Sequence, residues 1–131
     1  MEGSAGQASV TLVAEPAAVA RARAFLARTL EEAGVEEARR FEALLVTSEL
    51  VTNAICHGSR PGDQISLDVS LKGGRLRIGV RDAARGGSTP VALTPDEQRA
   101  AGRGLAMVEW LADWSERIVD GRREVRAELT L

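Results

Sequence analysis

Two neighbouring stretches of the chain alternate apolar and polar residues and are joined by a glycine turn. The first covers residues 65–71, the second covers residues 76–80, and Lys72-Gly73-Gly74 lies between them. Alternation with a period of two places every second side chain on one face of a strand, and a short connection containing glycine is typical of a hairpin. We therefore expect an antiparallel hairpin with one buried face, which needs a second layer to cover it.

The residues before this hairpin predict the covering layer. Apolar side chains recur at helical spacing over residues 16–33 and again over residues 35–56. Pro16 suits a first helical turn, and Gly34 suits the position just beyond a helix end. Residues 9–14 alternate weakly and predict a short strand before the first helix. On the second helix we expect an inner side formed by Phe41, Leu44, Leu45, Ser48, Val51, Thr52 and Ile55.

The residues after the hairpin predict a loop, a helical segment and a second hairpin. Residues 83–94 have no apolar period and contain several glycines and other small residues, which is typical of a loop. A short helix is expected to begin near Thr94, and an apolar stripe predicts a longer helix over residues 105–114, which includes Trp110 and Trp114. Residues 115–119 and 123–131 alternate again, so we expect a closing hairpin that turns at Asp120-Gly121.

The order strand, helix, helix, hairpin, loop, helix, hairpin predicts an α+β fold. We expect a two-layer α/β sandwich with a mixed, mostly antiparallel sheet and helices gathered on one face. A chain of 131 residues can enclose one hydrophobic core, so we expect a single domain. Residues 1–8 are rich in glycine, serine and alanine and are expected to form a disordered tail, which leaves residues 9–131 for the domain.

Composition narrows the classes of function. No apolar run approaches the ~20 residues that span a bilayer, and no export signal opens the chain, so we expect a cytoplasmic protein without a membrane span. Cys56 is the only cysteine, which excludes an internal disulfide and a metal site built on paired cysteines. A net charge of −2 argues against a generic nucleic-acid binder, because such proteins usually carry a basic stripe.

Glu49 and Asn53 are the first candidate site residues. They lie four positions apart in the second predicted helix, so their side chains share one face at a distance of one turn. A carboxylate and a carboxamide oxygen are hard donors of the kind that Mg²⁺ binds together with phosphate oxygens and water. The amide oxygen of Asn53 would ligate the ion, and Glu49 would act as a base or hold a water molecule. A solvated polar helix face has the same spacing and is the alternative.

Asp82 and a glycine turn are the remaining candidates. Asp82 directly follows a strand, where its carboxylate can accept a hydrogen bond from an exocyclic amine such as that of adenine or can simply cap a turn. Gly102-Arg103-Gly104-Leu105 opens a predicted helix. Glycines let the backbone approach phosphate oxygens, and a helix N-terminus offers free N–H groups and a favourable dipole. The segment predicts a phosphate-binding turn, with a tight helix entry as the alternative.

In this order the motifs resemble those of the GHKL, or Bergerat-fold, ATPases, which include gyrase, heat-shock protein 90, histidine kinases and DNA mismatch-repair ATPases. More narrowly, the chain is similar to the bacterial anti-sigma-factor serine kinases and their small stand-alone relatives, over nearly everything from Ser9 onward. The motifs that carry this resemblance are Glu49-Leu50-Val51-Thr52-Asn53-Ala54 with His57-Gly58, Val80-Arg81-Asp82, Gly102-Arg103-Gly104-Leu105-Ala106-Met107-Val108, and Val125-Arg126-Ala127-Glu128-Leu129.

The resemblance implies ATP and Mg²⁺ as ligands and a role for each motif. It implies that Glu49 is the general base, that Asn53 ligates Mg²⁺, and that Asp82 recognises the adenine amino group. Cofactor binding by the glycine turn would involve Gly102, Arg103, Gly104 and Leu105, with the two glycines close to the phosphates. Arg103 would neutralise developing charge if the turn closes over the triphosphate, and a solvated loop arginine is the alternative.

Two features depart from the family pattern. The adenine-recognising Asp is commonly followed by Gly two residues later, whereas Ala84 stands there in this chain. The closing hairpin often carries Thr near the position of Glu124, and an acidic side chain there would repel phosphate if it pointed inward. The sequence leaves the direction of Glu124 open.

The resemblance supports two hypotheses on function. In the first, the protein is a serine/threonine kinase that phosphorylates a small anti-sigma-factor antagonist and sequesters a sigma factor, with Glu49 accepting the hydroxyl proton. In the second, ATP only orders the loop over residues 83–103 and so switches affinity for a partner without turnover. Members of the resembled family are often dimers through the N-terminal strand and helix, which makes residues 10–14 a candidate interface for a homodimer.

Overall fold

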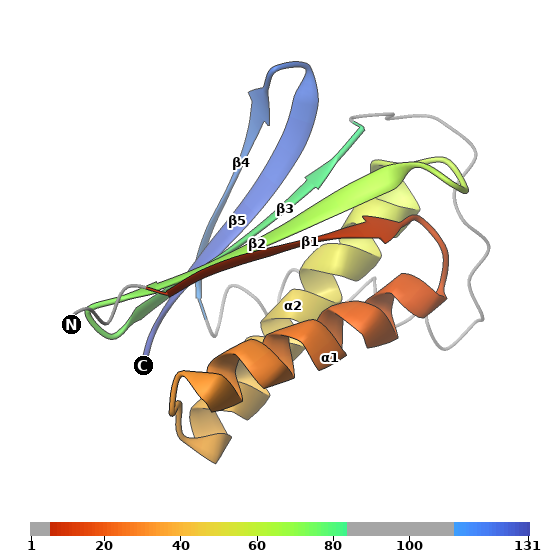
Figure 1. Ribbon diagram of the computed structural model, residues 1–131. Helices are drawn as coiled ribbons and strands as arrows, with labels where there is room; N and C mark the ends of the chain where they lie inside the picture. The colour runs from red at the N-terminus through yellow and green to blue at the C-terminus, as the bar shows by residue number, and fades with distance from the viewer. Residues whose placement is uncertain (1–5, 84–111) are drawn as a thin grey trace.

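The computed structural model describes residues 6–83 and 112–131, which form one sheet covered by two helices on one face (Figure 1). The elements are β1 (Gly6–Val13), α1 (Ala17–Glu32), α2 (Glu37–His57), β2 (Gln64–Lys72), β3 (Arg75–Asp82), β4 (Asp113–Val119) and β5 (Arg122–Thr130). The strand order is β1-β2-β3-β5-β4, and every pairing among these strands is antiparallel. The predicted α+β two-layer sandwich is confirmed, with a sheet that is antiparallel throughout the described residues instead of mixed.

Both predicted hairpins are present with their turns in the expected places. Gly73 and Gly74 connect β2 to β3 with φ of 57° and 77°. Asp120 and Gly121 connect β4 to β5 with φ of 53° and 76°. Two successive residues with positive φ twist a two-residue turn in the sense that matches the flanking strands, and glycine adopts this conformation at little cost.

The strand boundaries correct the sequence analysis at two places. β1 begins at Gly6, so Gly6, Gln7 and Ala8, which we expected in the disordered tail, pair with β2 across from residues 69–71. The start of β1 has no hydrophobic pattern because its residues are small or polar, but their backbone groups still form the hydrogen bonds of the β1–β2 ladder. β4 begins at Asp113, so Trp114 lies in a strand and not at the end of a helix. Residues 84–111, which include the expected short helix and most of the longer one, lie outside the described residues.

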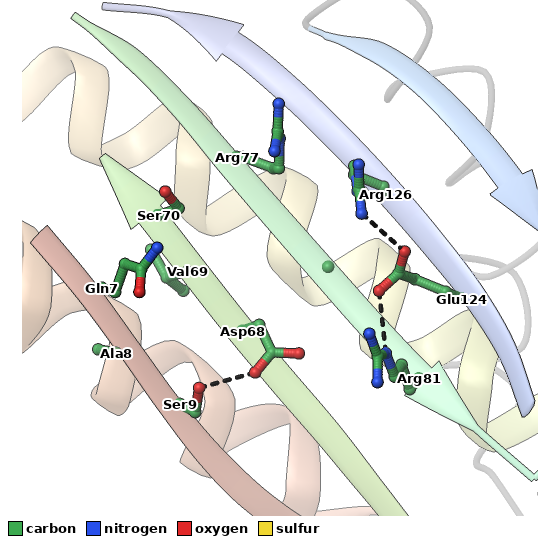
Figure 2. Close-up of a pocket in the computed structure, with 11 residues that line it drawn as sticks. Gln7, Ala8, Ser9, Asp68, Val69, Ser70, Arg77, Arg81, Glu124 and Arg126 are labelled. Carbon is green, nitrogen blue, oxygen red and sulfur yellow. Dashed lines mark hydrogen bonds and ion pairs between the residues drawn. The ribbon is translucent and has the colours of Figure 1, made fainter. Parts of the chain in front are cut away.

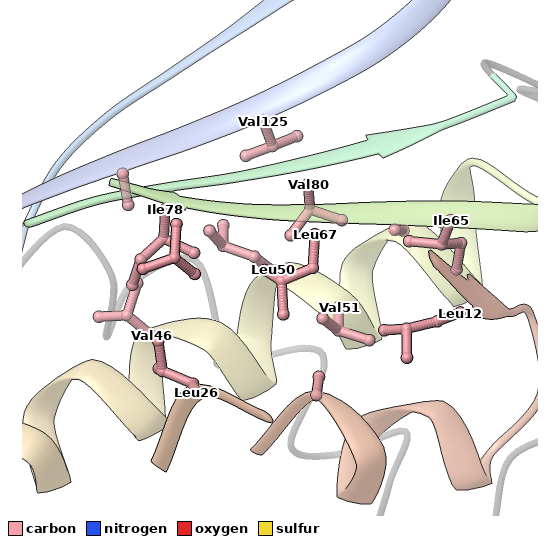
Figure 3. Close-up of a cluster of buried hydrophobic side chains, with 14 of the residues drawn as sticks. Leu12, Leu26, Val46, Leu50, Val51, Ile65, Leu67, Ile78, Val80 and Val125 are labelled. Atoms are coloured by element: carbon pink, nitrogen blue, oxygen red, sulfur yellow. The ribbon is translucent and has the colours of Figure 1, made fainter. Parts of the chain in front are cut away.

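The core lies between the sheet and the helices (Figure 3). Alternate residues of β2, β3 and β5 point toward the helices, as the period of two predicts, and α1 adds one buried stripe. The largest fully buried side chains are Leu26, Leu30, Val46, Leu50, Val51, Ile55, Ile65, Leu67, Leu76, Ile78 and Val80. Removing this apolar surface from water is the main force that holds the two layers together.

The buried face of α2 differs from the predicted inner side. Val51 and Ile55 are buried as expected, but Phe41 is 60% exposed and Leu44, Leu45, Ser48 and Thr52 are only partly buried. The buried residues of α2 are Ala43, Val46, Thr47, Leu50, Val51, Ala54 and Ile55. The helix packs against α1 as well as against β3 and β5. The face that it buries is therefore set by the neighbouring helix and by the sheet together. Neither described helix is long and apolar enough to cross a membrane.

Two features of this fold position the candidate site. Leu76, Ile78 and Val80 of β3 point toward the helices, and the same alternation directs Asp82, the last residue of β3, to that face. α2 ends at His57, and the backbone N–H of Gly58 donates to the carbonyl of Ala54 at 3.1 Å. The end of β3 and the end of α2 therefore meet at one edge of the core.

Candidate functional site

Glu49 lies on α2 with one carboxylate oxygen, Oε2, buried and without a hydrogen-bond partner among residues 6–83 and 112–131. Buried polar atoms are nearly always paired, so a carboxylate oxygen left without a partner marks either a cost to stability or a place for a ligand or a proton. Burial disfavours the charged form and raises the pKa of the Glu49 carboxyl above its ordinary value of 4.5. A carboxylate with a raised pKa is a better proton acceptor near neutral pH, as a general base requires.

The raised pKa of Glu49 predicts how stability depends on pH. A carboxyl whose pKa is raised by folding stabilises the protein below its unfolded pKa, and this contribution is lost as the pH rises through the folded pKa. Replacing Glu49 by Gln should therefore raise the free energy of unfolding at pH 7, because Gln has no charge to desolvate. The gain should vanish near pH 4, where Glu49 is protonated. Urea unfolding at the two pH values measures it, and an equal effect at both would contradict burial as the cause.

Asn53 follows one helical turn after Glu49 and is partly buried. Its backbone carbonyl accepts a hydrogen bond from the guanidinium of Arg123 at 3.4 Å, which links α2 to β5. Over residues 6–83 and 112–131 no group of three or more His, Cys, Asp or Glu side chains is placed to hold a metal ion. Beside nucleotides, Mg²⁺ usually takes one or two protein ligands and completes its shell with phosphate oxygens and water.

Asp82 is fully buried and forms an ion pair with Arg123. The Nε and Nη2 atoms of Arg123 lie 2.8 Å and 2.6 Å from Oδ2 of Asp82, and the two side chains are 14% and 1% exposed, respectively. Asp82 and Arg123 are direct partners in the β3–β5 ladder. Arg123 could not be predicted from the sequence, because residues 41 positions apart are brought together only by the pairing of these strands.

Gly58 makes room for the Asp82 carboxylate. A Cβ atom built on Gly58 would overlap both carboxylate oxygens of Asp82. The backbone of Gly58, with φ of −121° and ψ of −3°, is one that other residues also adopt, so space and not backbone conformation requires glycine here. Gly58 was part of the motif that carried the family resemblance, and its role in the structure is to let β3 approach the end of α2.

Glu124 points away from the helices, which settles the direction that the sequence left open. It lies on the outer face of the sheet with its side chain 4% exposed, and it pairs with Arg81 and Arg126, each at 3.0 Å (Figure 2). Arg117 of β4 also pairs with Glu124, at 2.9 Å. Burial alone would raise the pKa of Glu124, but the hydrogen bonds from Arg81 and Arg117 outweigh it, so the pKa is lowered. Glu124 therefore does not face Asp82, and the residue of β5 that does is Arg123.

A hollow of about 370 Å³ lies on this outer face, next to Gly79. Its lining includes Ser9 and Asp68, which are joined by a hydrogen bond of 2.7 Å, and two of the arginines that contact Glu124, Arg81 and Arg126 (Figure 2). Glu49 and Asp82 belong to the opposite, helix-covered side of the sheet. The hollow is thus separate from the predicted nucleotide site.

The structure brings part of the predicted site together. Asp82 lies against Gly58 just beyond α2, and Arg123 connects Asp82 to the backbone of Asn53. Glu49 lies one turn further along the same helix, with its buried oxygen. Gly102, Arg103, Gly104 and Leu105, the predicted phosphate-binding turn, lie outside the described residues. The described half of the site thus offers a proton acceptor, an amide and a buried carboxylate along one end of α2.

Comparisons with known proteins address the family and the fold of this chain. A family model described as histidine kinase-like ATPase domain matches residues 12–129. Among solved structures, the RsbU and RsbW domains of Rv1364c from Mycobacterium tuberculosis match with a TM-score of 0.68 and 24% sequence identity. The match covers 96% of this chain and 32% of that chain, so this chain spans about a third of the length of the solved one. No curated protein sequence gives a significant match.

Proposed function

Because the chain belongs to the histidine kinase-like ATPase domain family, we propose that it binds Mg-ATP beside α2 and acts as a regulatory serine/threonine protein kinase. The observation that carries this proposal is Glu49, which lies one helical turn before Asn53 and has a buried carboxylate oxygen without a partner in the described part of the chain. The match of the family model over residues 12–129 supports nucleotide binding, and the position of Glu49 supports transfer.

Different residues of the chain would bind different parts of Mg-ATP. The amide oxygen of Asn53 would hold Mg²⁺, and the carboxylate of Asp82 would accept a hydrogen bond from the adenine amine. Backbone N–H groups at Gly102 and Gly104 would contact the phosphates. Bound Mg-ATP supplies an electrophilic γ-phosphoryl group whose charge the metal ion offsets.

The chemical step then depends on Glu49. Its carboxylate would accept the proton of a serine or threonine hydroxyl of the partner as that oxygen attacks the γ-phosphorus of ATP. The bond from the γ-phosphorus to the bridging oxygen would break, and ADP would leave. Partial burial serves this role in two ways, because it raises the pKa of Glu49 toward neutrality and keeps bulk water from the carboxylate. A protein hydroxyl is the substrate class that fits, since a small domain of this kind can present the site to a partner surface.

For the partner, we propose a small anti-sigma-factor antagonist as the phosphorylated protein and a sigma factor as the sequestered one. This rests on the motifs shared with anti-sigma-factor serine kinases and on the fold shared with a solved structure that includes an RsbW domain. We also propose a cytoplasmic location. A homodimer through β1 is consistent with the position of β1 at one edge of the sheet, where its outer backbone groups can pair with another strand.

A second function is favoured by one specific observation, the ion pair between Asp82 and Arg123. A base-recognising carboxylate that is already paired would bind adenine weakly. Such a site suits a switch module in which nucleotide controls partner binding without turnover. Phosphate transfer to a partner separates this function from the kinase.

The test is calorimetric titration of ATP with Mg²⁺ into the intact protein and into Asn53→Ala. We expect binding by the intact protein and at least tenfold weaker binding by the variant, since loss of a metal ligand also loosens the phosphates that share the ion. Glu42→Gln is the matched control, because Glu42 lies on the same helix in a partly exposed pair with Arg39 and away from the site. No heat from the intact protein at millimolar ATP would refute nucleotide binding.

A further inference from the structure

The strongest unexplained feature of the described residues is the arginine that holds Asp82. Arg123 places two N–H groups on one oxygen of a carboxylate that is 1% exposed, and it also donates to the carbonyl of Asn53. Two of the residues that it contacts, Asp82 and Asn53, are those that the proposed function assigns to adenine and to Mg²⁺. Arg123 therefore contacts two of the residues to which the proposed function assigns nucleotide binding.

Arg123 and the amino group of adenine are both hydrogen-bond donors to the carboxylate of Asp82. The exocyclic amine of adenine requires an acceptor lone pair on Asp82. The guanidinium of Arg123 is charged and forms shorter and stronger hydrogen bonds with a carboxylate than a neutral amine does. Arg123 already directs two N–H groups at Oδ2 of Asp82, which leaves this oxygen less able to accept a bond from adenine.

The other arginines that pair with a buried carboxylate in this part of the sheet lie on its outer face. They surround Glu124, where no nucleotide is expected. On the helix side the geometry differs, because Gly58 leaves space for the Asp82 carboxylate at the end of α2 and Arg123 spans from β5 to the backbone of that helix. The pair thus connects β3 and β5 to the C-terminal part of α2.

We propose that Arg123 competes with the adenine amine for Asp82 and thereby sets the nucleotide affinity of this site. The inference rests on the proposed function, since it assigns to Arg123 the control of ATP binding at Asp82. In the resting protein the ion pair keeps ATP affinity low. The ATP affinity rises when Arg123 is drawn away from Asp82, for example by a carboxylate of a partner protein that pairs with its guanidinium.

The experiment is titration of Mg-ATP into the intact protein, Arg123→Thr and Arg123→Gln. We expect Arg123→Thr to bind ATP at least tenfold more tightly than the intact protein, and Arg123→Gln to show a smaller gain because its amide still donates to Asp82. In an Asp82→Asn background the gain should disappear. Arg126→Thr is the matched control, because Arg126 lies on the same strand but pairs with Glu124 on the outer face, so it should leave ATP affinity unchanged.

The outcomes separate this inference from the proposed function. If the intact protein binds ATP and Arg123→Thr binds it equally or more weakly, the competition is refuted while nucleotide binding stands. Tighter binding of GTP than of ATP by the intact protein also refutes it, since Arg123 would then donate to the guanine oxygen instead of blocking the base. If no form binds nucleotide, both proposals fail. Thermal melting identifies a Thr variant that does not fold, in which case the Gln variant decides.

Discussion

Replacing Glu49 by Gln is expected to lower the rate of phosphate transfer by about 10²–10⁴-fold, the usual contribution of a positioned general base. ATP affinity should change by less than about threefold, because Gln keeps the shape of Glu49 and the proposed nucleotide contacts come from other residues. The measurement is transfer of labelled γ-phosphate from ATP to a purified anti-sigma-factor antagonist, with calorimetry of ATP binding beside it. A loss of transfer with retained binding would establish Glu49 as catalytic.

Glu42→Gln is the control for this experiment. It removes the same charge from the same helix, but Glu42 is a third exposed and paired with Arg39 at 3.2 Å. Its rate of transfer should match that of the intact protein. Full transfer by Glu49→Gln would contradict the assignment of the base, whereas no transfer by the intact protein, despite ATP binding, would favour the switch module.

Replacing Gly58 by Ala is expected to lower the free energy of unfolding by about 2–3 kcal/mol, the typical cost of inserting a methyl group where no space exists. The new Cβ would overlap the Asp82 carboxylate, which cannot move freely because Arg123 holds it. Displacing Asp82 should also abolish the contact proposed for adenine, so ATP binding should weaken together with stability. Urea unfolding and calorimetry measure the two effects.

Two variants show whether the overlap is the cause. A Cβ at Gly6, in β1, would meet nothing within 4 Å, so Gly6→Ala should leave stability nearly unchanged. In an Asp82→Ala background, Gly58→Ala should cost much less than it does alone, because the atoms it overlaps are gone and the two changes are not additive. Equal costs in both backgrounds would show that Gly58 is required for some reason other than Asp82.

The sequence predicted most of the fold because the signals that define it are local. A period of two in β2 and β3, a helical period in α1 and α2, and glycine at the two turns depend on neighbouring residues only. Glu49 and Asn53 were recognisable for the same reason, since four positions on a helix always make one turn. Asp82 was recognisable from its place at the end of an alternating strand.

The features that the sequence did not predict all depend on contacts between distant elements. β1 begins at Gly6 because its backbone pairs with β2, although its first residues have no hydrophobic pattern. Phe41 is exposed because α1 and the sheet decide which face of α2 is buried, and the periodicity of α2 does not show where these neighbours lie. In each case the deciding contact lies outside the segment in which the residue occurs.

The candidate site also has features that the sequence indicates and features that only contacts between distant elements decide. The sequence by itself determined that this chain forms a sheet covered by helices and that a carboxylate, an amide and a second carboxylate occur at spacings suited to a nucleotide. Only the tertiary structure decided that Arg123 and not Glu124 faces Asp82, and that Gly58 lies against it. The reason is that the β3–β5 register sets which side chains of β5 share a face with Asp82, and a shift of one residue would exchange Arg123 for Glu124.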